Sequence, residues 1–163
     1  MSTVIHEKVR LAQEGKLPNA IIKLKSGWVL AADPQTVPGY CQLFSDPVVS
    51  SLNDLNEAER AHYCLDMIRV GDVLIEVTNA YRINYETWCN LTPALHTHIV
   101  PRYLSEPEEK RVLPVCKAYD TEPYQAPKAL LDAPADLLIG PFDEEKLSTF
   151  IAAMRRVLER ISK

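Results

Sequence analysis

The sequence predicts a single α+β domain built on a mostly antiparallel sheet. Strand-like runs follow one another across short turn signals, and helical patterns lie before, between and after them. Repeated strand–helix–strand units would instead give a parallel sheet, and this order of elements does not indicate them. The chain has 163 residues, which is enough for one domain with a sizeable core.

The N-terminal third predicts one helix and three strands. A helix is expected over residues 3–14, where apolar side chains recur among charged ones and Gly15 can end it. Residues 20–25 and 28–33 are expected to form a hairpin across a Ser-Gly turn. After a loop with two prolines and a glycine, the segment YCQLF is expected to be the third strand.

A long central helix is expected to begin after Asn56. Glu59 follows three residues later, so the pair has the spacing of a capping box, and the helix is expected to run to about residue 77. Its apolar face is expected to include four side chains, namely Ala61, Leu65, Ile68 and Val73.

The C-terminal half predicts two strands, an irregular segment and a helix. The segments AYRINYE and LHTHIVPRY are rich in β-branched and aromatic residues, and the turn sequence NLTP separates them. Residues 106–142 carry prolines too often for long regular elements, so an extended surface segment is expected there. A final helix is expected over residues 143–162, with Asp143 as its cap.

Composition and charge exclude several classes of function. The formal net charge of -4 and the pI near 5.6 give no basic surface of the kind that long nucleic acid needs, whereas a small anionic ligand requires only a local cluster of donors. No signal-peptide pattern and no membrane-span-length apolar run occurs, so a cytoplasmic protein without a membrane partner is expected. The four scattered cysteines are expected to be free thiols.

Two histidines one residue apart are the candidate chemical groups. In a strand, His96 and His98 would share one face of the sheet. An imidazole can attack phosphorus at neutral pH, and a neighbouring imidazole can stabilise the charge that develops on the phosphate oxygens. Two alternatives remain open: the pair is partly buried structure, or Cys89 joins both histidines as a zinc ligand.

The segment from Ala94 to Arg102 resembles the signature of the histidine triad superfamily of nucleotide hydrolases and transferases. That signature reads His-φ-His-φ-His-φ-φ and commonly continues into Pro-Arg, and here alanine stands at the first histidine. The segments DPQTVPGYCQLF and RINYETWCN are similar to the family's upstream strands, so the resemblance covers about residues 20–105. It implies a HIT-like α+β fold with a five-stranded antiparallel sheet and packed helices, often as a homodimer.

The resemblance also implies roles for particular residues. His96 falls at the nucleophile, His98 at the histidine that contacts the scissile phosphate, and the carbonyl of position 94, which alanine keeps, orients the nucleophile. The positions that it implies for substrate binding are Asn90, Asp33, Gln35, Arg82, Asn84 and Arg102. Val48 stands where many relatives have a histidine, so one supporting contact is expected to be missing.

The function expected from these residues is hydrolysis or nucleotidyl transfer at the α-phosphate of a nucleotide, through a covalent nucleotidyl-His96 intermediate. The alternative is a nucleotide-binding regulatory module with little or no catalysis, which the replacements at Ala94 and Val48 motivate. The expected partner is a nucleotide or another small phosphorylated substrate. The histidine route requires no cofactor, and Mg²⁺ would accompany a polyphosphate substrate.

Overall fold

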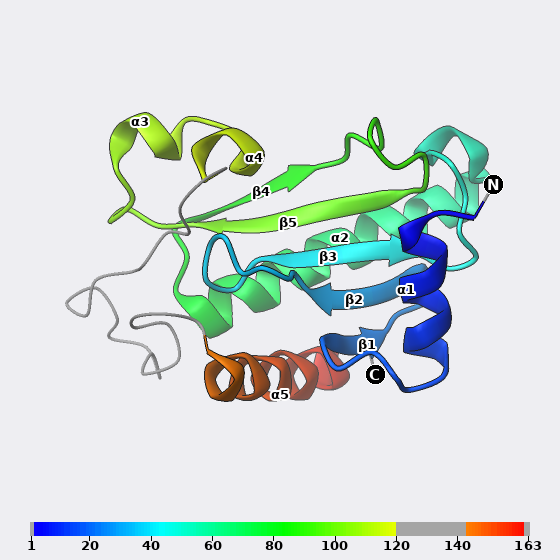
Figure 1. Ribbon diagram of the computed structural model, residues 1–163, viewed down its shortest axis with the longest axis horizontal. Coiled ribbons are helices and arrows are strands. Elements are labelled where there is room, and N and C mark those ends of the chain that lie inside the picture. The colour runs from blue at the N-terminus through cyan, green and yellow to red at the C-terminus, as the bar shows by residue number, and fades with distance from the viewer. Residues whose placement is uncertain (1, 120–142, 162–163) are drawn as a thin grey trace.

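The computed structural model describes residues 2–119 and 143–161 and contains the predicted five-stranded antiparallel sheet. The strands lie in the order β1-β2-β3-β5-β4 (Figure 1). Their bounds are β1 (Ala20–Lys23), β2 (Gly27–Ala31), β3 (Cys41–Ser45), β4 (Arg82–Glu86) and β5 (His96–Arg102). The α+β class and the sheet that the sequence predicts are therefore confirmed.

Two long helices cover one face of the sheet. Helix α2 (Glu57–Thr78) and helix α5 (Glu144–Ile161) contribute to one core cluster with inward-facing residues of β2, β3 and β5. Tyr63 of α2 donates a hydrogen bond to the Leu43 carbonyl and lies 3.0 Å from the Thr97 hydroxyl, which fixes the helix against β3 and β5. The odd-numbered positions of β5 thus belong to the core.

On the opposite face, the described residues form a covering at each of the two ends. Helix α1 (Val4–Gln13) packs Ile5 and Val9 against Leu30 and Phe44 at one end. At the other end, Val115 and its neighbours pack against Val100. Because side chains alternate along a strand, the even-numbered positions of β5 face the space between these two coverings.

Helix α2 begins as the sequence predicts but buries a different face. Asn56 Oδ1 accepts from the Glu59 amide at 3.0 Å, and the Glu59 carboxylate accepts from the Asn56 amide at 2.9 Å. Of the expected apolar face, only Val73 is buried, and Leu65 and Ile68 are 53% and 43% exposed. Apolar side chains occur on several sides of this helix, so periodicity could not select the face that packs on the sheet.

The segment after the sheet is partly helical. Residues 106–119, expected to be extended, form α3 (Glu108–Arg111) and α4 (Val115–Ala118), and Pro107 and Pro114 occupy their N-cap positions. Prolines shorten these helices but are tolerated at helix starts, so each helix has one turn. The remainder of the expected extended segment, residues 120–142, lies outside the described residues.

Helix α5 confirms the predicted C-terminal helix. Asp143 Oδ1 accepts from the Lys146 amide at 2.9 Å, which is the expected capping bond. Phe150, Met154 and Leu158 are buried along one face. Within the described parts of the chain, no helix has the length and apolarity that crossing a membrane would require.

Candidate active site

Strand β5 places the two imidazoles on the face of the sheet that the long helices leave free. The rings of His96 and His98 lie with centroids 4.9 Å apart and planes 75° from each other. His96 is 9% exposed and His98 is half-buried. The expectation that both rings stand on one face is confirmed.

The carbonyl of Ala94 orients His96. His96 Nδ1 lies 2.8 Å from this oxygen, which can only accept a hydrogen bond, so the proton of the neutral ring is on Nδ1. The other nitrogen, Nε2, then carries a lone pair, as a nucleophile must. Phe44 holds the ring edge-to-face at 6.0 Å from the other side. The contact expected from position 94 is therefore present although the residue is alanine.

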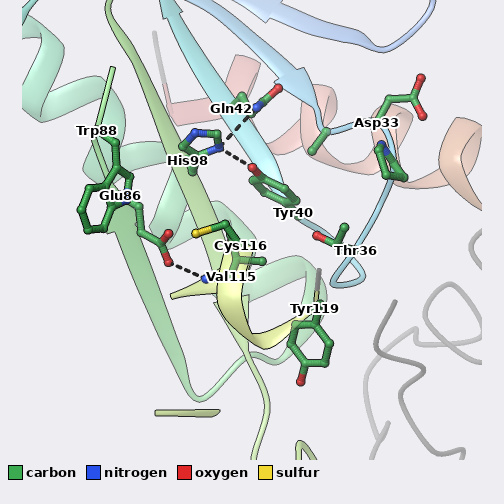
Figure 2. A pocket seen from close by; sticks show the side chains of 12 residues that line it. Asp33, Thr36, Tyr40, Gln42, Glu86, Trp88, His98, Val115, Cys116 and Tyr119 are labelled. Atoms are coloured by element: carbon green, nitrogen blue, oxygen red, sulfur yellow. Dashed lines mark hydrogen bonds between the residues drawn. The ribbon is translucent and has the colours of Figure 1, made fainter. Parts of the chain in front are cut away.

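His98 is held in the opposite tautomer. Gln42 Nε2 donates to His98 Nδ1 at 3.3 Å, and the Tyr40 hydroxyl also hydrogen-bonds this nitrogen (Figure 2). A ring nitrogen that accepts leaves its proton on Nε2, where it can be donated to a ligand. Burial, and secondarily the neighbouring His96, lowers the pKa of His98 to about 4, so this ring is neutral at pH 7.

Val48 and the residues that hydrogen-bond His98 belong to different surroundings. Val48 packs with apolar residues near α1. Tyr40, at the start of β3, and Gln42 within it make the contacts to His98. Strand alternation in YCQLF puts these two side chains on one face. The register that places Gln42 opposite His98 is set by the pairing of β3 with β5, which the sequence does not show.

A pocket of about 260 Å³ opens beside His98 (Figure 2). The loop after β2, strands β3 and β4, and helix α4 form its walls, and the side chains that line it include Asp33, Thr36, Glu86, Trp88, Cys116 and Tyr119. His96 does not line this pocket but lies next to His98. Tyr40, Gln42 and Glu86 belong to no motif that the sequence shows, and they were not expected at the site.

Four of the six expected binding residues are Asp33, Asn90, Asn84 and Arg82, and their binding roles stay predictions. Asp33 lies at the pocket wall, exposed, and Asn90 is exposed in the loop before β5. Asn84 and Arg82 project from β4 on the same face as the histidines, opposite Val100 and Arg102. Only Asp33 of these four lines the pocket itself.

Gln35 holds its own loop together. Its Nε2 donates to the carbonyls of Ala32 and Tyr40 at 2.6 and 2.8 Å, and its Oε1 accepts from the Gly39 amide at 2.9 Å. Both ends of the amide are thus occupied within the chain. The expectation that Gln35 binds substrate is corrected to a role in shaping the loop that carries Asp33.

Arg102 is also structural. It is 1% exposed, and its guanidinium forms a bidentate ion pair with Glu106 at 3.1 and 2.7 Å. Its remaining donors bond the carbonyls of Leu113 and Lys110 at 2.8 and 3.0 Å. A charge that is fully paired below the surface cannot also hold a substrate, so the expected binding role is wrong. The residue instead fastens the α3–α4 segment to β5.

The structure does not assemble the alternative zinc site. The Cys89 thiol donates to the His96 carbonyl at a sulfur–oxygen distance of 3.8 Å and packs against the core of the other face. Across residues 2–119 and 143–161, no three histidine, cysteine or acidic side chains gather in a metal-binding arrangement.

Comparisons with known proteins agree with this architecture. No protein-family model matches the chain, and no curated protein matches it. Among solved structures, a histidine triad protein from Bradyrhizobium japonicum is similar at 23% identity and a TM-score of 0.64, over 91% of this chain and 94% of that one. A hypothetical histidine triad nucleotide-binding protein from Sulfolobus tokodaii is similar at 10% identity and a TM-score of 0.65, over 95% and 93%.

A zinc-bound histidine triad family protein from Mycobacterium smegmatis is similar at 14% identity and a TM-score of 0.57, over 91% of this chain and 89% of that one. These identities are low and the matches span nearly whole chains. The chain therefore has the fold of the histidine triad proteins.

Proposed function

We propose that this protein cleaves a nucleotide at its α-phosphate, as a hydrolase or nucleotidyl transferase of the histidine triad type. The observation that carries the proposal is the hydrogen bond from His96 Nδ1 to the Ala94 carbonyl at 2.8 Å. It fixes the proton on one nitrogen and leaves the lone pair on the other, which is what an attack on phosphorus requires.

The reaction would proceed in two displacements. His96 Nε2 forms a bond to phosphorus while the bond from phosphorus to the leaving group breaks and the leaving group keeps the electron pair. Water, or another acceptor hydroxyl, then attacks phosphorus, the nitrogen–phosphorus bond breaks, and the acceptor loses its proton to solvent. His96 returns to its neutral form.

His98 would serve the same phosphate as a neutral donor. Its Nε2–H is free of the contacts that Tyr40 and Gln42 make to Nδ1, and it can bind an oxygen on which charge accumulates. Asn90 would donate to the phosphate, Asp33 would accept from a sugar hydroxyl, and Asn84 and Arg82 would contact the substrate from β4.

Replacement of His96 tests the chemistry. His96→Ala should lower turnover of adenylyl and guanylyl esters, anhydrides and phosphoramidates by about a thousandfold or more. Mass spectrometry of quenched wild-type enzyme should show a nucleotidyl adduct that this variant lacks. His62→Ala, a histidine on α2 outside the site, is the matched control and should keep both. Turnover retained by a folded His96→Ala protein would eliminate the mechanism.

A nucleotide-binding module with little or no catalysis is the second candidate. It is favoured by the pKa of about 4 at His98, because a ring that is neutral at pH 7 has no extra proton to give to a poor leaving group. Calorimetry with adenosine and guanosine monophosphates beside a hydrolysis assay separates the two functions. Binding without turnover across the substrate panel would support this second one.

We also propose a homodimer formed through α2 and β4. Strand β4 is an edge strand, and Gly71 of α2 lies against Tyr85 of that strand. On this helix Leu65, Ile68 and Ile75 are 53%, 43% and 45% exposed, an apolar stripe beside an open strand edge. Such a surface suits a self-complementary contact between two copies.

A further inference from the structure

Glu86 is the charged side chain that the register places beside His98. It is the last residue of β4 and pairs directly with His98 across the β4–β5 ladder. Directly opposed residues have Cβ atoms about 5 Å apart, so a molecule held by His98 is within reach of this carboxylate. One carboxylate oxygen accepts from the Val115 amide at 3.1 Å, which fixes the side chain in the pocket wall (Figure 2).

The other carboxylate oxygen of Glu86 has no hydrogen-bond partner among the described residues. Aromatic rings contributed by Tyr40, Trp88 and Tyr119 line the same pocket, and Trp88 is 56% exposed. The hydroxyl of Thr36 also lines the pocket, where it is buried and unpartnered within the described parts of the chain. The pocket therefore offers a carboxylate oxygen beside flat apolar surfaces.

The charge of the pocket selects between classes of ligand. Asp33 is the other charged side chain in the described lining, and it is also acidic. Lys110 stacks on Tyr119 at 5.1 Å but does not line the pocket. A second phosphate group would be repelled here, whereas a carboxylate beside aromatic rings favours groups that donate N–H bonds or carry positive charge.

We infer that Glu86 is a specificity-determining residue that recognises an amino group on the substrate. The inference rests on the proposed function and deepens it: the substrate is a single phosphate whose attached group, lying in the pocket beside His98, bears nitrogen donors. That chemistry has two sources, a protonated alkylamine or the exocyclic amino group of a nucleobase.

Two matched ligand pairs separate these sources. Aminoethyl phosphate and ethyl phosphate differ by a protonated amine, and adenosine monophosphate and purine riboside monophosphate differ by an exocyclic amino group. Calorimetry on the full chain at pH 7.5 should show a preference of about fivefold to tenfold for the amino-bearing member of at least one pair. The pair that shows it identifies the source.

The variant Glu86→Gln removes the charge and keeps the shape and an acceptor for the Val115 amide. It should reduce the preference for the amino-bearing member to about twofold or less. Glu109→Gln, which removes an exposed carboxylate of α3 outside the pocket, is the charge-matched control and should keep the full preference.

Three results would overturn the inference: no measurable binding of either amino-bearing ligand, equal affinity within both pairs, or an unchanged preference in Glu86→Gln. Tighter binding of adenosine diphosphate than monophosphate, with or without Mg²⁺, would also overturn it. Failure of the covalent mechanism is recognised separately, by the absence of a His96 adduct. An amine preference without the adduct would leave Glu86 as the selecting residue of a binding module.

Discussion

Removing one partner of the buried ion pair between Arg102 and Glu106 should be strongly destabilising, because it leaves the other charge buried and unpaired. Glu106 is 3% exposed and accepts four hydrogen bonds: two from the Arg102 guanidinium, one from the Tyr103 amide at 2.7 Å and one from the Tyr119 hydroxyl at 2.6 Å. In Glu106→Gln, an amide NH₂ replaces one acceptor oxygen, so the two hydrogen bonds to that oxygen are lost. The new NH₂ group then faces the groups that donated to the oxygen.

Each bond to a charged group contributes about 1.5–3 kcal/mol, and loss of one partner of a buried pair costs about 3–5 kcal/mol. Glu106→Gln should therefore lower the free energy of unfolding by about 3–5 kcal/mol, measured by urea denaturation. Glu109→Gln, an exposed position, should change it by less than about 0.5 kcal/mol. A loss below about 1 kcal/mol in Glu106→Gln would refute the conclusion that Arg102 is structural, and would reopen a binding role for it.

Three further predictions concern the site, the interface and the sheet. The ¹⁵N NMR titration of His98 should give a pKa of about 4, and a measured pKa near 6.5 would show that burial does not lower it. Because the unfolded ring binds a proton more readily than the folded one, the stability that this group contributes should be complete above pH 6.5 and should decline as the pH falls toward 4. Light scattering should give the mass of a dimer of two 18.4-kDa chains. Ile68→Glu should give a monomer, whereas Leu104→Glu, at an exposed apolar position elsewhere, should stay dimeric. A dimeric Ile68→Glu protein would exclude the α2 interface. Gly27→Ala should lower the free energy of unfolding by about 1–3 kcal/mol, because the added Cβ would lie 1.9 Å from the Phe44 carbonyl oxygen. The control is Lys25→Ala at an exposed position, and equal unfolding midpoints for the two variants would contradict this close approach.

Predictions from short sequence patterns were correct where backbone geometry alone fixes the position of a side chain. Side-chain alternation placed His96 and His98 on one face. The contact to His96 uses only the main-chain oxygen of position 94, so alanine there did not remove it. The capping residues Asn56 and Asp143 likewise act on amides three residues away. Each of these interactions lies within a few residues of sequence.

Predictions were wrong where a residue's packing partner is distant in the sequence, or where its side chain suits either substrate binding or a structural contact. Arg102 carries a guanidinium, a group that commonly binds phosphate, and its carboxylate partner Glu106 is only four residues away. The fold of the α3–α4 segment brings the Lys110 and Leu113 carbonyls to the same guanidinium, and no pattern in the sequence indicated this burial. Leu65 and Ile68 are apolar and helical, yet the sheet packs against another side of the helix. Neither outcome is encoded in the periodicity of one segment.

The sequence by itself determined the class of the domain, the order of its strands and long helices and the paired imidazoles, because these follow from periodicity, caps and main-chain geometry. Tertiary structure alone decided the surroundings of that pair: Gln42 and Glu86 lie opposite His98 in the two flanking ladders, although they are 56 and 12 positions away in the chain. Strand register joins residues irrespective of their separation, and it also sets the burial that lowers the pKa of His98.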